Sequence, residues 1–416
     1  MTTTTSRTSP VPARGLWPVA LCWIAVALDG FDLVVLGAVI PVLGETGALG
    51  FTDTSLTLVA TIGLIGVGNG AVLIGPITDR FGRRRSLISC IAVFSVCTLL
   101  VAVAPSVAVF AALRFVAGLG LGACLPTALA FMTEYVPSER GGTAVTRTMT
   151  GYHVGAVLTA FLALLLIKPL GWEAMFVVGG VAGLLSLPVM LARLPESEAY
   201  LTSRAGGAPV RTSAVVRGRF LAISIALWVA SFMGLLLVYG LNTWLPKIME
   251  VAGYSTGDSL GLLLALNLGA VTALLIAGLI SDARGNKPTV LVWFALAAVF
   301  LAGLCIKLES TVAVYVAVFL AGVFVFSAQV LVYAFVGHLY PPDVRGTALG
   351  LAAGVGRVGA IVGPFLGGAL VTAGIAYPWG FYLFALAAVL AVVALSVVPA
   401  HVDSRVPARP TAQRSS

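Results

Sequence analysis

Long apolar stretches recur along almost the whole of this 416-residue chain, and they constrain its fold more than any other feature. A stretch of about 18 or more apolar residues can cross ~30 Å of hydrocarbon as an α-helix, whereas strands of a membrane β-barrel alternate over about ten residues. Only 10% of the residues are charged, against about 25% in soluble proteins. The sequence therefore predicts an all-α integral membrane protein, with the lipid bilayer around it.

The apolar stretches divide into twelve predicted transmembrane helices. They cover residues 16–43, 54–77, 86–104, 107–132, 148–167, 173–192, 220–245, 257–281, 288–306, 311–337, 347–374 and 377–398. The polar segments 1–15 and 399–416 are predicted cytoplasmic tails, without a cleaved signal peptide. All five cysteines fall within the spans without the spacing of metal ligands, so no metal site and no cofactor is expected.

The basic residues indicate how the chain is oriented, because Lys and Arg are retained on the cytoplasmic side during insertion. In the loops after odd-numbered spans the basic residues are Lys168, Lys247 and Lys307, whereas the tails and the loops after even-numbered spans hold nearly all others. We expect a monomeric, multi-pass protein of the cytoplasmic membrane with both termini in the cytoplasm. This asymmetry accounts for the net charge of +8, so no nucleic-acid partner is expected.

The chain is an internal duplication. The segment "GPITDRFGRRRSL" aligns with "GLISDARGNKPTV" at an offset of 203 residues (278 − 75), and "EYVPSERGGT" aligns with "HLYPPDVRGT" at 204 (338 − 134). The matched positions in the first pair are Gly75, Asp79, Gly82 and Arg84 with Gly278, Asp282, Gly285 and Lys287. The pattern predicts two parallel six-helix repeats, 16–192 and 220–398, joined by a cytoplasmic linker, 193–219. Transporters built from repeats bind their substrate between them.

These segments carry a resemblance to a known family. "GPITDRFGRRR" resembles the G-x-x-x-D-R-x-G-R-R signature of the major facilitator superfamily, and "RFVAG" from Arg114 resembles its span-4 motif. Within the superfamily, "DGFD", "ERGG" and "GVGRVGAIVGP" resemble the aromatic acid:proton symporter family, which includes benzoate and hydroxybenzoate carriers. The resemblance implies the major facilitator fold and proton-coupled uptake of a small aromatic acid anion by alternating access.

Two acidic residues, Asp29 and Asp32, interrupt the first span. Inserting a charged residue at the centre of a bilayer costs roughly 2.5 to 3.5 kcal/mol of free energy. Such residues are therefore expected to have interacting partners and a functional role. Three residues apart, the carboxyls lie on one helix face and are expected to look into one cavity. Burial and mutual repulsion favour their protonated forms, which predicts a role in proton coupling. The alternative is a structural pair that holds the first span against a neighbour.

Two arginines also lie within spans, Arg114 in the fourth and Arg357 in the eleventh. A guanidinium stays protonated and presents a planar fork that suits a carboxylate. We predict that Arg114 serves coupling and substrate binding, pairing with the acids of the first span or with the substrate; the alternative is a permanent buried salt bridge. Arg357 is predicted to bind the substrate carboxylate, with a pairing to Asp79 as the alternative.

Other polar and aromatic residues in the spans are candidates for contacts with the substrate ring. Amide and imidazole groups can hydrogen-bond ring hydroxyls and aromatic side chains can stack on the ring, although both also serve helix packing. The predicted set is Phe31, His153, Tyr239, Asn242, Asn267, Gln329 and Tyr333.

Charged residues at the cytoplasmic span ends form a predicted gate. Loop charges there can fix topology and also latch the inward side. Glu134 and His338 occupy equivalent positions in the two repeats, which favours gating over substrate contact. The predicted gating set is Asp79, Arg80, Arg84, Glu134, Arg140, Asp282, His338 and Arg345.

Other functions fit the sequence less well than aromatic acid uptake. The sequence contains no nucleotide motif, metalloprotease motif or nucleophile triad, so no enzyme and no catalytic residue is predicted. A sugar or polyol:proton symporter is the first alternative, because "EYVPSER" also resembles the sugar-carrier pattern. A drug:proton antiporter would carry a G-P motif that span 5 lacks, and a membrane sensor would be expected to carry a soluble domain.

Overall fold

The protein is described from a computed structural model covering residues 16–205, 215–254, 256–307 and 310–400. Within these ranges it is all-helical, and twelve helices are long and apolar enough to cross a membrane, which confirms the predicted fold class. The predicted tail 1–15, nearly all of the tail 399–416 and the centre of the linker lie outside the described residues.

The first repeat, called the N-half here, contains six long helices. They are α1 (Leu16–Thr46), α2 (Asp53–Phe81), α3 (Arg83–Val101), α4 (Val107–Tyr135), α5 (Gly141–Leu170) and α6 (Glu173–Arg193), with the short 3₁₀ helices η1 (Ala48–Gly50) and η2 (Ser138–Arg140). Polar caps begin several of them: the Ser106 hydroxyl accepts a hydrogen bond from the Val109 backbone N–H, and Thr52 forms a capping box with Ser55.

The second repeat, the C-half, repeats this plan. Its helices are α8 (Arg219–Val251), α9 (Thr256–Arg284), α10 (Asn286–Gly303), α11 (Thr311–Leu339), α12 (Pro342–Thr372) and α13 (Ala376–Ser396). The linker between the halves contains a short helix, α7 (Glu198–Ala205), which the sequence analysis did not predict.

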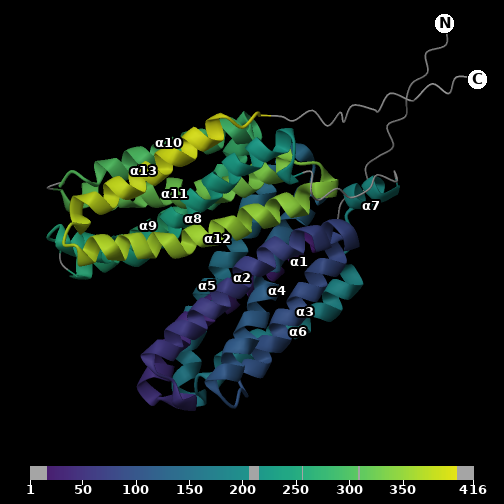
Figure 1. Ribbon diagram of the computed structural model, residues 1–416, viewed down its shortest axis with the longest axis horizontal. Helices are drawn as coiled ribbons and strands as arrows, with labels where there is room; N and C mark the ends of the chain where they lie inside the picture. The colour runs from purple at the N-terminus through teal and green to yellow at the C-terminus, as the bar shows by residue number, and fades with distance from the viewer. Residues whose placement is uncertain (1–15, 206–214, 255, 308–309, 401–416) are drawn as a thin grey trace, which may run out of the picture.

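The two halves form a V (Figure 1). They pack against each other at the end where α7 lies, and they separate toward the other end. The outer helix surfaces expose large apolar side chains, such as Leu164 at 80% and Leu185 at 70%. Exposed apolar area of this kind is expected where lipid, and not water, surrounds a protein. The chain is therefore a multi-pass membrane protein.

Two symmetry-related crossings hold the halves together. α2 crosses α12 where a Cβ on Gly75 would lie only 2.4 Å from the Thr347 Cα, and α9 crosses α5 where a Cβ on Gly278 would lie 2.7 Å from the Thr143 Cα. Both glycines belong to the duplicated motif. Small residues let helix backbones approach closely, so the repeat supplies both crossings from one motif.

Candidate substrate site and latches

A cavity of about 290 Å³ lies between the halves. Its wall combines apolar, aromatic and amide side chains from α4, α5, α8, α9, α11 and α12. Of the predicted substrate-binding residues it brings together His153, Tyr239, Asn242, Asn267, Gln329, Tyr333 and Arg357. Apolar walls with a few convergent polar groups are typical of small-molecule sites.

Arg357 is the cation that lines this cavity. Its Nη1 donates a hydrogen bond to the Tyr239 hydroxyl at 2.9 Å, across from α12 to α8. No other hydrogen bond to its guanidinium occurs within the described ranges, so the rest of the planar fork remains available. Asp79, the alternative partner considered from the sequence, instead contacts Arg83 and Thr347 of α12.

Two asparagines form a polar wall in the C-half. The Asn267 Nδ2 donates to the Asn242 Oδ1 at 3.0 Å and to the Leu263 carbonyl at 2.9 Å, and the Asn242 Nδ2 donates to the Val238 carbonyl at 3.0 Å. Because carbonyl oxygens only accept, these bonds fix which way both amides point. The Asn267 Oδ1 then remains as an acceptor, and one Asn242 amide proton remains as a donor.

A third amide, Gln329, lies deeper. Its Nε2 donates to the Ser231 hydroxyl at 3.3 Å, and that hydroxyl donates to the Ala352 carbonyl at 2.8 Å. Its Oε1 is buried and accepts no hydrogen bond within the described residues. This oxygen packs against α8 at Gly234, where a Cβ would lie 2.0 Å away. Gln329 therefore braces the C-half wall more directly than it serves the cavity.

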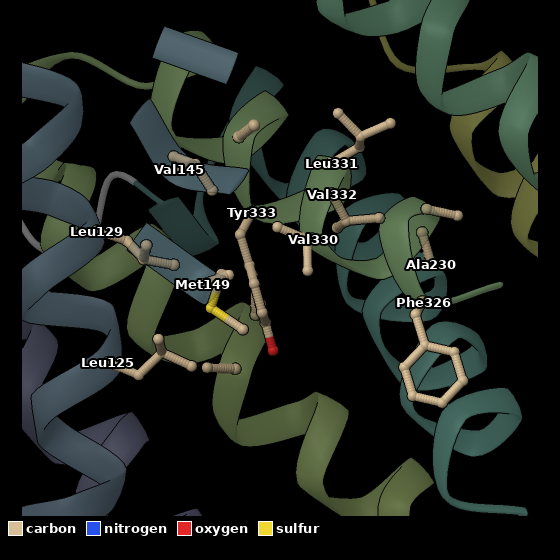
Figure 2. Close-up of a cluster of buried hydrophobic side chains, with 14 of the residues drawn as sticks. Leu125, Leu129, Val145, Met149, Ala230, Phe326, Val330, Leu331, Val332 and Tyr333 are labelled. Atoms are coloured by element: carbon tan, nitrogen blue, oxygen red, sulfur yellow. The ribbon is translucent and has the colours of Figure 1, made fainter. Parts of the chain in front are cut away.

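Aromatic residues complete the lining. Figure 2 shows Tyr333 of α11 lying between Met149 and Leu125 of the N-half and the C-half cluster around Val330, Val332 and Phe326. Tyr152 also lines the cavity, and its ring meets His153 edge-on at 5.7 Å. The sequence analysis missed Tyr152, although its position next to His153 in a span gave a usable signal.

Arg114 does not line the central cavity. Its Nη1 lies 2.7 Å from the Asp32 Oδ1, its Nη2 donates to the Asp32 carbonyl at 3.2 Å, and the Thr98 hydroxyl donates to the other carboxylate oxygen at 2.5 Å. This is a buried ion pair entirely within the N-half. Arg114 instead borders a separate cavity of about 170 Å³ between α1, α2 and α4. This pairing with an acid of the first span agrees both with the predicted coupling role and with a permanent salt bridge, and the predicted contact with substrate stays a prediction.

Asp29 occupies a different environment from Asp32. It is completely buried, and neither carboxylate oxygen has a hydrogen-bond partner among the described residues. No ion pair to Asp29 occurs among the described residues, whereas Asp32 pairs with Arg114. Neither acid lines the central cavity, so the expectation that both look into one cavity is not met. Arg114 and Thr98 instead bind the two oxygens of the Asp32 carboxylate.

Phe31 also lies outside the cavity. It is 7% exposed and belongs to an N-half cluster with Val35, Phe110 and Phe176. Its ring fills the space above Gly179 of α6, where a Cβ would lie 2.7 Å from the Cε1 atom. Phe31 and Asp32 are neighbours on α1 and face different directions. The Asp32 side chain points to Arg114, and the Phe31 ring packs on α6, outside the substrate cavity.

The N-half contributes what we call the first latch. The two Asp79 carboxylate oxygens, at the end of α2, accept hydrogen bonds from the Gly346 N–H at 3.0 Å and the Thr347 N–H at 2.8 Å, and the Thr347 hydroxyl adds a third at 2.6 Å. Gly346 and Thr347 are the fifth and sixth residues of α12, so the carboxylate meets this helix about one turn after its N-terminus. A negative charge is favourable near this end of the helix dipole. The contact therefore ties α2 to the start of α12 in the other half.

A buried arginine, Arg83, stands behind this latch. It lies 3.2 Å from Asp79 and 2.8 Å from Glu134, and its guanidinium also donates to the Thr78 and Pro342 carbonyls. Arg345 reaches the same Glu134 oxygen at 3.6 Å. The sequence analysis selected Arg80 and Arg84 but missed Arg83, because the repeat alignment places Asn286 opposite it. Its position four residues after Asp79 was the available signal.

The C-half contributes the second latch. The Asp282 Oδ1 accepts from the Gly142 N–H at 2.7 Å and its Oδ2 from the Thr143 N–H at 2.9 Å, which ties α9 to the start of α5. His338 is exposed and shares a surface cavity with Asp282 and Asn286. The two symmetric positions Glu134 and His338 therefore differ, one buried in an ion network and the other at the surface.

The remaining predicted gating arginines lie beside the latches. Arg80 is exposed over the Phe81 ring at 5.4 Å, and Arg140 is exposed in η2. The Arg84 Nη2 donates to the Leu191 carbonyl at 2.6 Å, which links α3 to α6 within one half. The linker closes over this region: the Glu196 carboxylate accepts from the Arg83 N–H at 2.8 Å, and the Ser197 hydroxyl donates to Glu134 at 2.5 Å.

Comparisons with known proteins agree on the kind of molecule. The family profile of the Major Facilitator Superfamily matches residues 22–272 and 256–415. The chain is 36% identical to the gentisate transporter of Corynebacterium glutamicum, over 93% of this chain and 88% of that protein. It is 30% identical to the benzoate transport protein of Acinetobacter baylyi (91% and 88% covered) and to a 4-hydroxybenzoate transporter of Pseudomonas aeruginosa (93% and 93%).

Solved structures share the fold. The transporter FucP in the outward conformation superposes with a TM-score of 0.76 at 13% identity, covering 92% of this chain and 98% of that one. The proton:xylose symporter XylE superposes with a TM-score of 0.75 at 18% identity, covering 92% and 96%. At such identities the likeness concerns the arrangement of helices alone.

Proposed function

This chain belongs to the major facilitator superfamily, and from that premise we propose that it takes up an aromatic carboxylate together with protons across the cytoplasmic membrane by alternating access. Family membership makes it a transporter and not an enzyme, and its curated relatives carry aromatic acids. The observation that carries the proposal is the central cavity, where one available guanidinium lies within an apolar and aromatic wall.

Arg357 would bind the substrate carboxylate. Tyr239 uses one of its N–H groups, so the remaining groups can take a carboxylate while the Tyr239 hydroxyl stays beside it. Asn242 lies three residues after Tyr239 on α8, about one helical turn away and so at roughly the breadth of a benzene ring. A ring with its carboxylate on Arg357 can thus place a hydroxyl at the asparagine pair.

The hydrogen bonds of the asparagine pair favour a hydroxylated ring. A phenolic hydroxyl can donate to the Asn267 Oδ1 and accept from the Asn242 amide. A methoxyl group can only accept, and an unsubstituted ring does neither. The names of the relatives, which include gentisate and 4-hydroxybenzoate transporters, support this class.

Asp29 would carry the coupled proton. It is buried and, unlike Asp32, is not held by a hydrogen-bond partner among the described residues. In the proposed cycle Arg357 of the other half would stabilise the Asp29 carboxylate while the site holds no substrate. Binding of the substrate carboxylate to Arg357 would remove that stabilisation, and Asp29 would take up a proton with the substrate. With one proton per monoanion the cycle moves no net charge; a second proton would add about 2.3 kcal/mol per 100 mV.

The latches would act as the gate on the cytoplasmic side. The distribution of basic residues supports a cytoplasmic position of the tails and the linker, and with that orientation the end at which the halves separate in Figure 1 would face outward. Rocking of the halves would then break both latches and close the splayed end.

Uptake of labelled benzoate, 4-hydroxybenzoate and gentisate into vesicles, with and without a protonophore, tests the proposal. We expect protonophore-sensitive accumulation that Arg357→Ala lowers by a hundredfold or more (about 3 kcal/mol), with Arg193→Gln, an exposed arginine outside the cavity, as the matched control. Asp29→Asn should exchange labelled for unlabelled substrate but not accumulate it. Accumulation of xylose instead, or undiminished accumulation by Asp29→Asn, would contradict the proposal.

A further inference from the structure

A second, larger cavity lies on the surface of the N-half, away from the substrate site. It measures about 620 Å³ and is bordered by α2, α3 and α4. Its α2 side runs from Gly70 to Phe81 and exposes Leu73 at 58%, Ile77 at 45% and Phe81 at 53%. At 1.5 Å per residue this side is about 16 Å long. That length matches one leaflet, which is half of the ~30 Å hydrocarbon core.

The polar groups of this groove all lie at one end. Arg85, Ser86 and Ser89 border it near the start of α3, at the latch end of the molecule, and Val93 follows deeper along the same helix. Arg85 is exposed and forms no hydrogen bond or ion pair within the described residues. The groove thus has a cationic rim at one end and an apolar interior beyond it. A phospholipid has the matching arrangement, with a phosphate headgroup followed by an acyl chain.

The Ser86 hydroxyl is a second, independent observation that points to a ligand in this groove. The residue is only 4% exposed, lines the groove, and its hydroxyl has no hydrogen-bond partner among the described residues. A buried hydroxyl without a partner is costly, so such groups are normally satisfied by something. A phosphate oxygen held at the rim by Arg85 would accept its proton.

We propose that this groove binds one anionic phospholipid from the leaflet on the latch side, with its phosphate on Arg85 and Ser86 and an acyl chain along α2. The charge of the rim selects an anionic headgroup, since Arg85 is a single unpaired cation and no acidic residue lines the groove. The lipid would contact one side of α2 while Gly75 and Asp79 on the same helix contact α12.

Native mass spectrometry of the purified, delipidated protein tests the proposal with phosphatidylglycerol and with phosphatidylcholine of the same acyl chains. We expect preferential retention of one phosphatidylglycerol. Arg85→Gln should weaken it about tenfold, as expected for the loss of a charge-assisted hydrogen bond, and Ser86→Ala by a smaller factor. Arg85→Lys should retain most of the binding.

Two further variants separate a site from general surface attraction. Ser89→Phe should block the groove and lower retention without changing charge, whereas Arg193→Gln removes an exposed arginine outside the groove and should leave retention within about twofold. Equal losses from Arg85→Gln and Arg193→Gln, undiminished retention in Ser89→Phe, or equal retention of both lipids would overturn the proposal.

Discussion

The two latches share a backbone geometry and differ in charge. In each, an aspartate at the end of one helix accepts two backbone N–H bonds at the start of a helix in the other half, at 3.0 and 2.8 Å for Asp79 and 2.7 and 2.9 Å for Asp282. Only the first latch, within the described residues, adds buried ion pairs, through Arg83 and Glu134. Both repeats thus keep the contact between an aspartate and two backbone N–H groups, and among the described residues the buried ion pairs are found at the first latch.

The same division holds at the centre of the molecule. The N-half carries Asp29 and the Asp32–Arg114 pair, while the C-half carries Arg357, Tyr239 and the asparagine wall. Proton handling and substrate recognition are thus expected on opposite sides of one interface. Under the proposed function, a change in the relative position of the halves would change the distance between Asp29 and Arg357.

The largest difference between the latches is expected for their central positions. Arg83→Gln leaves the buried carboxylates of Asp79 and Glu134 without their main counter-ion. We expect this to lower the stability of the closed latch by on the order of 3 to 5 kcal/mol. Asn286→Ala, at the equivalent position, breaks no ion pair but removes the acceptor of the buried Ser281 hydroxyl, so it should destabilise the second latch by about 1 kcal/mol. Labelling of a cysteine at Thr133, which packs against Gly337 across the interface, reports the opening of this end. Equal labelling rates in both variants would refute the asymmetry.

The next largest effects are expected at the two latch aspartates, Asp79 and Asp282. Asp79→Asn and Asp282→Asn each remove charge from a pair of helix-terminal hydrogen bonds, at about 1.5 to 3 kcal/mol. Asp79→Asn should lie at the upper end because Arg83 also loses a partner. The same cysteine reporter measures both variants. A larger effect from Asp282→Asn would show that the helix cap, and not the ion network, decides latch strength.

A smaller effect sharpens the assignment of recognition to the C-half. Asn267→Leu removes the free acceptor of the polar wall, so the preference for 4-hydroxybenzoate over 4-methoxybenzoate should fall about tenfold, or roughly 1.4 kcal/mol. Competition against labelled benzoate measures the ratio. Thr243→Val, an exposed neighbour on α8 that does not line the cavity, is the control. An unchanged ratio in Asn267→Leu would place hydroxyl recognition elsewhere.

The smallest effect comes from copying the first network into the second latch. The double variant Asn286→Arg and His338→Glu places an ion pair beside Asp282, where both residues border one surface cavity. Because His338 is exposed, the expected gain is only about 0.2 to 1 kcal/mol. Cysteine labelling should slow by a factor of up to about five, and high salt should reverse the change. Faster labelling would show that the added charges repel one another.

Features that depend on local sequence pattern could be predicted without the structure. Apolar stretches of membrane length predict the twelve helices, because a helix in lipid satisfies its own backbone. The repeat at Gly75 and Gly278 predicted that the two halves are equivalent, and the structure places both glycines at interhelical crossings. Arg357 stood out because an unpaired charge in a span is rare, and it does line the central cavity.

Only the tertiary structure decided how the charges pair. Asp29 and Asp32 look alike in the sequence, yet Asp32 is held by Arg114, which is 82 residues away, and Asp29 has no such partner. Asp79 meets Thr347 across 268 residues, and Arg83 is buried between them although its repeat equivalent is an asparagine. These pairings depend on helix rotation and packing between distant segments, and hydrophobic periodicity constrains neither.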